Sequence, residues 1–171
     1  MPSFGSKEGN VLYLIACAAP PTQQLTSVVE QLQQAGWNTC VILTPAATHW
    51  VDASSLTKLT GNRVRSDFRG PRDPEFAPRG DAVLVAPATF NTINKCATGA
   101  SDNLALGLMN EAIGRNVRMT LVPWVNDALA AHPAYKDSLM RLESAGVRIA
   151  TPQPGQDIDS VALGAVGRPQ R

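Results

Sequence analysis

The chain has 171 residues, a length that suits one domain, and 44% of them are apolar, enough to bury a sizeable core. Its 15 basic and 14 acidic residues give a net charge of +1, which argues against a nucleic-acid binder that gains affinity by neutralising phosphates. No run of the sequence approaches the roughly 20 apolar residues that span a bilayer, so we expect no membrane segment.

The three cysteines indicate the compartment. Cys17, Cys40 and Cys96 form an odd set without C-x-x-C spacing, which argues against a disulfide scaffold and a structural metal site and favours a reducing cytoplasm. The letters Leu14–Cys17 also match the lipid-attachment box of bacterial lipoproteins. The apolar run before that cysteine is shorter than the roughly 7–15 residues of a signal peptide, and a buried first strand explains the same letters.

Strand and helix patterns alternate in the first half of the chain. Residues 1–10 are polar and predict a loose, flexible N-terminus ahead of a domain over 11–150. Short apolar runs predict buried strands, and apolar residues at helical spacing predict helices that end near glycines. The expected strands are Val11–Cys17 and Thr39–Leu43, and the expected helices are Gln23–Ala35 and Ala46–Leu59.

The alternation continues in the second half. A short third strand is expected near Val64 within 62–80, a charge-rich and proline-containing stretch that otherwise predicts an irregular surface loop. The tail 151–171 is rich in Gly, Pro and Gln and is expected to be flexible. Between them we expect strands over Asp81–Ala86, Met119–Val122 and Val147–Ala150, and helices within Pro87–Gly99 and over Asp102–Ile113 and Pro133–Ala145.

These elements predict an α/β fold, a single-domain Rossmann-like (flavodoxin-like) arrangement of three layers around a parallel sheet of about six strands. The helix over Asp102–Ile113 is apolar around much of its circumference, which predicts burial against the sheet or another subunit. In such folds ligands lie beyond the carboxyl ends of the strands. The site is therefore expected in the loops Ala18–Thr22, Thr44–Thr48, Pro87–Lys95 and Pro123–Asn126.

Common catalytic and nucleotide-binding signatures are absent from the sequence. It contains no G-x-G-x-x-G, no G-x-x-x-x-G-K-[ST], no H-E-x-x-H and no G-x-S-x-G. Its two histidines, His49 and His132, are isolated and more typical of surface or capping positions than of catalysts. The loop over Pro87–Thr92 is more informative, because small residues let the backbone approach a ligand while Thr89, Asn91 and Thr92 supply polar groups. A helix that starts there would favour a phosphate, although a plain cluster of capping residues fits the same letters.

Four segments resemble one family. Ala86–Thr92 and Gly99–Leu104 resemble the P-A-S-A-N-T and G-I-x-D-N-L segments of the homo-oligomeric flavin-containing cysteine decarboxylases, which include phosphopantothenoylcysteine decarboxylase and the lantibiotic and linaridin peptidyl-cysteine decarboxylases. Leu59–Val64 resembles the segment before the family's third strand. Pro123–Asn126, with His132-Pro133, resembles the substrate motif P-x-M-N-x-x-M-W-x-x-P. The resemblance runs from about Val11 to Gly155.

The sequence also departs from this family. The family has a histidine eight residues before the aspartate that opens the fourth strand, and Asp73 occupies that position here. The first loop carries Ala19-Pro20 instead of a Gly-Ser or Ala-Ser pair. The late A-C-G cysteine of the phosphopantothenoyl branch is missing from the nearest match, Ala162–Gly164. The methionines and tryptophan of the substrate motif are replaced by Val125, Leu129 and Ala130.

The resemblance implies a chemistry and a site. FMN would oxidise the cysteinyl side chain, so that loss of carbon dioxide leaves an enethiolate. Asn91 and Asn126 would be catalytic and would hold the substrate's carboxylate or thiolate. The cofactor would contact Ala18, Ala19, Pro20, Thr44, Pro87, Ala88, Thr89, Asn91, Thr92, Asp102 and Asn103.

The expected function is oxidative decarboxylation of a peptide's C-terminal cysteine to an aminoenethiol, as in ribosomal-peptide tailoring. The missing late cysteine favours this peptidyl branch. Three alternatives stay open: a phosphopantothenoylcysteine decarboxylase-like enzyme, a flavin prenyltransferase, and a flavin-binding protein without decarboxylase activity, which the absent histidine supports. The resemblance also implies a homo-oligomer, a trimer or a dodecamer of trimers, with a cysteine-containing peptide or small molecule as partner.

Overall fold

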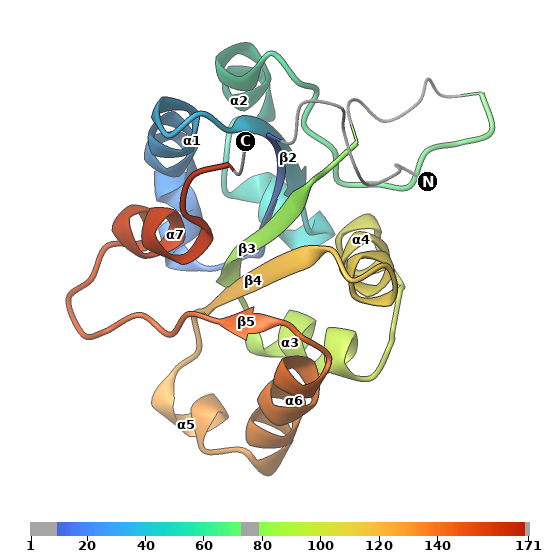
Figure 1. Cartoon of the computed structure of the whole chain (residues 1–171), viewed down its shortest axis with the longest axis vertical. Coiled ribbons are helices and arrows are strands. Elements are labelled where there is room, and N and C mark those ends of the chain that lie inside the picture. Colours follow the sequence, from blue (N-terminus) through green and yellow to red (C-terminus); the bar gives the residue numbers. More distant parts are fainter. Residues whose placement is uncertain (1–9, 73–78, 170–171) are drawn as a thin grey trace.

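A computed structural model describes residues 10–72 and 79–169. Asp73, which stands at the position of the family histidine, and residues 1–9 of the expected N-terminal segment lie outside the described residues. The fold places one parallel sheet at the centre of the molecule, with helices on both of its faces (Figure 1).

Within residues 10–72 and 79–169 the sheet has five strands in the order β2-β1-β3-β4-β5, all parallel. The strands are β1 (Val11–Ala16), β2 (Asn38–Leu43), β3 (Ala82–Ala88), β4 (Arg118–Pro123) and β5 (Arg148–Ile149). Every residue of β1 and β3 is buried, because both faces of these central strands are covered. The α/β class and the three layers predicted from the sequence are confirmed.

The expected strand count of about six is corrected to five. Near Val64 the chain contributes only an isolated parallel bridge between Arg65 and Ile42. Two backbone hydrogen bonds hold it, from Arg65 N to Val41 O (3.1 Å) and from Leu43 N to Arg65 O (2.8 Å). On its N-terminal side the ladder does not continue, because Thr39 O, the next acceptor on β2, accepts from the side-chain Nδ2 of Asn62 (3.0 Å).

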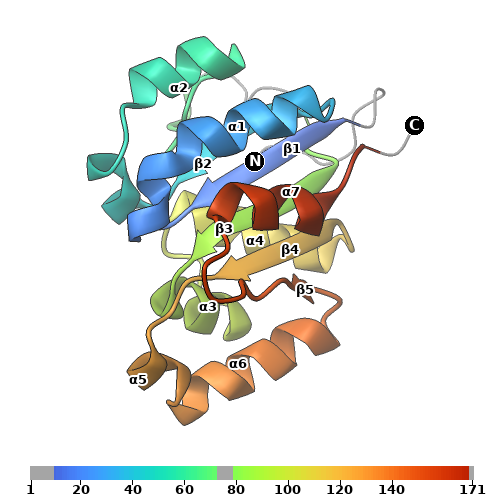
Figure 2. The ribbon, with the colours of Figure 1, turned by 90° about the vertical axis from the view of Figure 1, so that its left-hand side faces the viewer.

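The helices form two layers (Figure 2). One core cluster packs α3, α4 and α6 on one face of the sheet, and a second packs α1, α2 and α7 on the other. Among the described residues, no helix is long and apolar enough to cross a membrane. The α-helices are α1 (Leu25–Gln34), α2 (Ala53–Thr60), α3 (Phe90–Ala97), α4 (Leu104–Gly114), α5 (Asp127–Ala130), α6 (Pro133–Ser144) and α7 (Ile158–Val166), and the 3₁₀ helices are η1 (Pro20–Gln24) and η2 (Pro45–His49).

Two expected helices are each divided in the structure. Residues 23–35 are shared between η1 and α1, and residues 46–59 between η2 and α2. Asp52 begins α2 afresh, because its carboxylate accepts a hydrogen bond from Ser54 N (2.9 Å). Gly61 ends α2 at a φ of 70°, a left-handed conformation that glycine adopts without strain.

The apolar circumference of α4 is buried within the single chain. All six residues of the segment Leu104–Met109 are buried, and all of them except Gly107 join the core cluster that also contains Val83 and Leu121 of the sheet. Of the two alternatives expected for this helix, the sheet therefore accounts for its burial. A second subunit is not needed to cover it.

The expectation of a flexible tail over 151–171 is corrected for its helical part. Helix α7 packs on the sheet with Ile158, Ala162, Ala165 and Val166 buried. Its ends are held by side chains of the opposite half of the chain, because Trp37 Nε1 donates to Gly167 O (2.7 Å) and Gln31 Nε2 donates to Asp159 Oδ2 (2.7 Å).

Candidate active site

Two adjoining clefts lie at the carboxyl ends of β1 to β4, where the predicted loops meet. The first, about 530 Å³, we call the threonine cleft; it is lined by Ala18, Thr44, Pro45, Ala46, Thr89, Asn91, Thr92, Lys95, Asp102 and Asn103. The second, about 690 Å³, we call the tryptophan cleft; it is lined by Ala18, Ala19, Pro20, Trp50, Thr89, Phe90, Asn91, Trp124, Val125, Asn126 and Leu129. The two clefts share Ala18, Thr89 and Asn91.

The predicted site residues divide into two groups. All of them except Pro87 and Ala88 line one or both clefts. Pro87 and Ala88 are buried in β3, where their carbonyls accept from Cys17 N (3.1 Å) and Trp124 N (2.8 Å). These two residues therefore tie the ends of neighbouring strands together beneath the site and do not line it.

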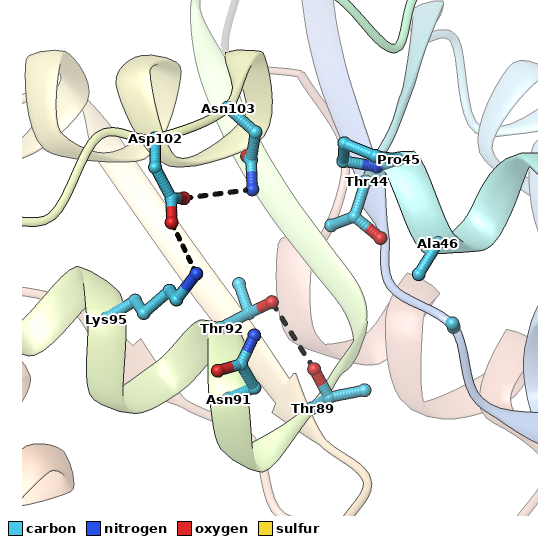
Figure 3. A pocket seen from close by; sticks show the side chains of 10 residues that line it. Thr44, Pro45, Ala46, Thr89, Asn91, Thr92, Lys95, Asp102 and Asn103 are labelled. Atoms are coloured by element: carbon cyan, nitrogen blue, oxygen red, sulfur yellow. Dashed lines mark hydrogen bonds and ion pairs between the residues drawn. The ribbon is translucent and has the colours of Figure 1, made fainter.

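The first turn of α3 lines the threonine cleft, and no side chain caps its backbone N–H groups. Thr89 is the N-cap residue, but its side chain caps no backbone N–H. Its hydroxyl instead donates to Thr92 Oγ1 at 3.3 Å (Figure 3). The first turn of α3 is left free to bind an anion, which the helix dipole also favours.

The buried thiol of Cys17 contacts the first turn of α3. Cys17, at the end of β1, donates its S–H to Thr92 Oγ1 at 3.4 Å. Burial raises the pKa of this thiol above its ordinary value, so it stays protonated at neutral pH. A protonated, buried thiol is a weak nucleophile, and the contact that the structure shows for Cys17 here is its hydrogen bond to Thr92.

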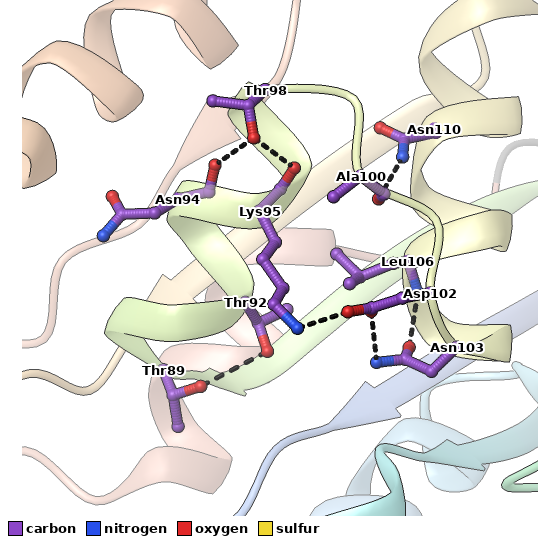
Figure 4. Close-up of polar contacts among 10 residues, drawn as sticks. All are labelled: Thr89, Thr92, Asn94, Lys95, Thr98, Ala100, Asp102, Asn103, Leu106 and Asn110. Carbon is purple, nitrogen blue, oxygen red and sulfur yellow. Dashed lines mark hydrogen bonds and ion pairs between the residues drawn. The ribbon is translucent and has the colours of Figure 1, made fainter.

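An ion pair, drawn in Figure 4, is part of the lining of the threonine cleft. Lys95 of α3 pairs with Asp102, which precedes α4. Asn103 lies beside them: its Nδ2 donates to Asp102 Oδ1 (3.4 Å), and its Oδ1 caps α4 by accepting from Leu106 N (3.0 Å). Both charged side chains are well exposed, so the pair shapes the wall more than it stabilises the fold.

The tryptophan cleft is mostly apolar, and its polar side chains include the carboxamides of Asn91 and Asn126 and the hydroxyl of Thr89. Asn126 N-caps α5 through its Oδ1, which accepts from Leu129 N at 2.9 Å, and this leaves its Nδ2 free to donate. Asn91 supplies the second carboxamide from the first turn of α3. None of the described residues that line this cleft is charged. Amide N–H groups in uncharged surroundings are suited to hold a carboxylate or a thiolate.

Several lining residues were not named individually as site residues from the sequence. Trp124 follows β4 directly, inside a loop that was expected at the site, and its position was the available signal. Lys95 lies four residues after Asn91 and so on the same face of α3, a spacing that could have indicated it. Four more of these residues also lie in loops that were expected at the site: Pro45, Ala46, Phe90 and Val125. Leu129 stands in the segment that resembles the substrate motif, and Trp50 lies outside all of these segments.

Neither histidine lines the two clefts. His132 instead N-caps α6, because its Nδ1 accepts from Ala134 N at 3.1 Å, and its ring lies edge-on to Phe90 with centroids 5.7 Å apart. The part of the chain that the structure describes contains no cluster of His, Cys, Asp or Glu that could hold a metal ion. All three cysteines are buried and unpaired.

Sequence comparisons identify relatives along nearly the whole chain. The family model described as Flavoprotein matches residues 4–166. The coenzyme A biosynthesis bifunctional protein CoaBC of Bacillus subtilis is 30% identical over 166 residues, which cover 94% of this chain and 37% of that protein. A cysteine/cysteine sulfinic acid decarboxylase of an unknown prokaryotic organism is 31% identical over 120 residues, or 67% of this chain and 32% of that protein. The chain thus spans about a third of the length of these relatives.

Solved structures share the fold. The FMN-dependent cysteine decarboxylase TvaF from thioviridamide biosynthesis superposes with a TM-score of 0.76 at 27% identity, and the match covers 91% of this chain and 96% of that one. The epidermin biosynthesis protein EpiD from Staphylococcus aureus superposes with a TM-score of 0.69 at 20% identity, over 86% and 84% of the two chains.

The threonine cleft fits a flavin with a phosphate. Free N–H groups at the start of α3 suit the phosphate, and the hydroxyls of Thr44, Thr89 and Thr92 suit its oxygens or the polar edge of a ring. The adjoining tryptophan cleft leaves room for a substrate beside it. The chain belongs to the Flavoprotein family, the family of the homo-oligomeric flavin-containing cysteine decarboxylases.

Proposed function

We propose that the chain is an FMN-dependent decarboxylase that acts oxidatively on the C-terminal cysteine of a peptide. The observation that carries the proposal is the position of Asn91, which lines both clefts. A side chain at this junction can contact a cofactor in one cleft and a substrate in the other. The 27% identity with TvaF, an FMN-dependent cysteine decarboxylase, supports the same assignment.

The cofactor is proposed to occupy the threonine cleft. When bound, FMN supplies the two-electron oxidation that gives the substrate an electron sink for loss of carbon dioxide. The first turn of α3 would hold its phosphate, with Thr89 and Thr92 around it, and Thr44 would contact it from the end of β2. Ala18, at the junction of the clefts, has a small side chain that lets a flat ring lie close to the backbone.

The substrate is proposed to occupy the tryptophan cleft. Asn91 and Asn126 would donate hydrogen bonds to the carboxylate or thiolate of the terminal cysteine. Because none of the described lining residues is a cation, the carboxylate would be held by neutral donors only. A carboxylate held without a counter-charge is less stabilised than in water, and that favours its loss as neutral carbon dioxide.

A phosphopantothenoylcysteine decarboxylase is the second candidate. The 30% identity with CoaBC over 94% of this chain favours it. The sequence lacks the late cysteine of that branch, which favours the peptidyl substrate. A flavin-binding protein without decarboxylase activity is the third candidate.

We also propose that the protein is a homo-oligomer and that it is located in the cytoplasm. The three unpaired thiols fit this location.

Direct incubation tests these alternatives. Purified protein should be yellow and should release FMN, not FAD, on denaturation. Incubated with cysteine-ended peptides, it should remove about 46 Da, the mass of carbon dioxide plus two hydrogens, as mass spectrometry would show. Turnover of phosphopantothenoylcysteine alone would favour the second candidate. A yellow protein that changes neither substrate would favour the third.

A further inference from the structure

The thiol of Cys17 is buried at the end of β1 and lines neither cleft. The backbone of this residue is fixed on both sides. Its N–H donates to Pro87 O at 3.1 Å, and its carbonyl accepts from the hydroxyl of Thr22 at 2.6 Å. The residue is only 1% exposed. The position of the sulfur is therefore set by the ends of β1 and β3 and by the start of η1.

The hydroxyl oxygen of Thr92, in the first turn of α3, accepts two hydrogen bonds. The Cys17 thiol donates to Thr92 Oγ1 at 3.4 Å, and the Thr89 hydroxyl donates to the same oxygen at 3.3 Å. Burial raises the pKa of Cys17 more than its contacts with Thr92 and Thr89 lower it, so the sulfur carries the proton that it donates at neutral pH. A hydroxyl oxygen has two acceptor positions, and these two bonds occupy both.

The proton of the Thr92 hydroxyl is left without an acceptor. Thr92 is 4% exposed, and within residues 10–72 and 79–169 its hydroxyl accepts two hydrogen bonds and donates none. Thr92 lines the threonine cleft, and in Figure 3 its hydroxyl lies on the side of α3 that faces Thr44. A buried donor without a partner costs free energy, so an acceptor in the cleft would bind more tightly by pairing with it. The start of α3 favours a negatively charged acceptor there.

Resting on the proposed function, we propose that Cys17 is a positioning residue for the phosphate of the cofactor. Its thiol and the Thr89 hydroxyl fill both acceptor positions of Thr92 Oγ1, and the Thr92 hydroxyl is thereby held as a donor toward the phosphate oxygens. Without the thiol, one acceptor position opens and the hydroxyl is free to rotate away from the phosphate. The sulfur lines neither cleft, so it acts on the phosphate only through Thr92.

The preference for FMN over riboflavin measures this effect, because the two flavins differ only in the phosphate. Full-length protein freed of flavin is titrated with each flavin, and the quenching of flavin fluorescence gives the two Kd values. In Cys17→Ala the ratio of the riboflavin Kd to the FMN Kd should fall about 10-fold, which corresponds to about 1.4 kcal/mol. Both Kd values come from the same preparation, so a smaller folded fraction affects them alike.

Two control variants and a double-mutant cycle separate donation by the thiol from its packing. Cys17→Ser keeps a donor at this position and should keep most of the ratio. Cys40→Ala removes another buried thiol that lines neither cleft, and it should keep the full ratio. Thr92→Val keeps the branched shape without the hydroxyl and should lower the ratio by itself. Adding Cys17→Ala to Thr92→Val should lower the ratio no further, because the thiol acts through that hydroxyl.

The flavin titrations need no turnover, so their outcome is separate from that of the decarboxylation assay. A ratio that falls in Cys17→Ala and holds in Cys17→Ser and Cys40→Ala would support the role of the thiol even if no peptide were decarboxylated. An unchanged ratio in Cys17→Ala, a Cys17→Ser variant that behaves like Cys17→Ala, or a further loss in the double variant would overturn it, whatever the decarboxylation assay shows. Wild-type protein that binds both flavins equally, or neither, would overturn it as well.

Discussion

The oxygen and the nitrogen of the Asn126 carboxamide are available to different partners. Its Oδ1 accepts from Leu129 N and caps α5, while its Nδ2 is free to donate into the tryptophan cleft. Asn126→Asp keeps the capping acceptor and removes the donor. We expect this variant to lose about 10²–10³-fold in kcat, the usual cost of one donor to a developing charge, with flavin content unchanged.

The comparison with Asn91 sharpens this prediction. Asn91 lines both clefts, so Asn91→Ala should lower flavin content together with turnover. Flavin is measured by absorbance and turnover by mass spectrometry on the same samples. Full activity in Asn126→Asp would show that the reaction does not need the Asn126 carboxamide. Equal flavin loss in both variants would contradict the assignment of the cofactor to the threonine cleft and of the substrate to the tryptophan cleft.

Because their thiols are buried, Cys40 and Cys96 should make the free energy of unfolding fall at alkaline pH. Burial raises the pKa values of Cys40 and Cys96 from 9.0 to about 12. Above about pH 9 the unfolded chain loses these protons while the folded chain keeps them, so the free energy of unfolding falls until the folded thiols ionise too. Each thiol contributes at most about 1.4 kcal/mol per pH unit in this window.

Urea denaturation at about pH 8 and about pH 10 measures this loss. Cys40→Ala lowers stability at both pH values but should flatten the decline between them. Ser138→Ala, which alters a buried residue without removing a thiol, should keep the full decline. An identical decline in wild type and Cys40→Ala would show that Cys40 ionises alike in both states.

Among the secondary-structure elements, helix α7 lies in a segment that was expected to be a flexible tail, and it packs as part of the core. Ile158 is buried at its start, so Ile158→Ala should lower the free energy of unfolding by about 2–5 kcal/mol. Val161→Ala, on the same helix at a partly buried position, should cost less. Chemical denaturation gives both values. No loss in Ile158→Ala would mean that α7 leaves the sheet in solution.

The strands were predictable because their letters are nearly continuous apolar runs, as over Val11–Ala16. Helix α7 was missed although Ile158, Val161, Ala162 and Ala165 follow helical spacing, because flanking Gly, Pro and Gln outweighed the pattern. The bridge at Arg65 was over-extended to a strand, since a short β-type run does not reveal that Thr39 O, the next acceptor on β2, is taken by the side chain of Asn62. Tertiary hydrogen bonds of this kind leave no periodic signal.

The candidate site was partly predictable for a topological reason. Loops after parallel strands converge at one sheet edge, so Thr44, Asn91 and Asn126 could be grouped without coordinates. Trp50 could not be added to them, because its place depends on how η2 turns the chain. Pro87 and Ala88 were assigned to the cofactor from the motif, although β3 buries both residues.

For the whole molecule, we predict a trimer or a dodecamer of trimers. Helix α4 no longer supports this assembly, since its apolar residues are covered within one chain. Exposed apolar side chains at the rim of the tryptophan cleft give a better reason, because contact with another subunit would cover them. These side chains are Trp50, Trp124 and Leu129, each exposed by 36% to 39%. Light scattering with a flavin-loaded sample should return three chains or a multiple of three. A monomer would contradict the prediction.

The central claim is that a cofactor cleft and a substrate cleft meet at Asn91. Anaerobic mixing of flavin-loaded protein with a cysteine-ended peptide tests it most directly, with the visible absorption of the oxidised flavin as the readout. We predict rapid bleaching with the cysteine peptide and none with the same peptide ending in serine. A flavin-loaded protein that binds the cysteine peptide and keeps its full absorption would contradict the account.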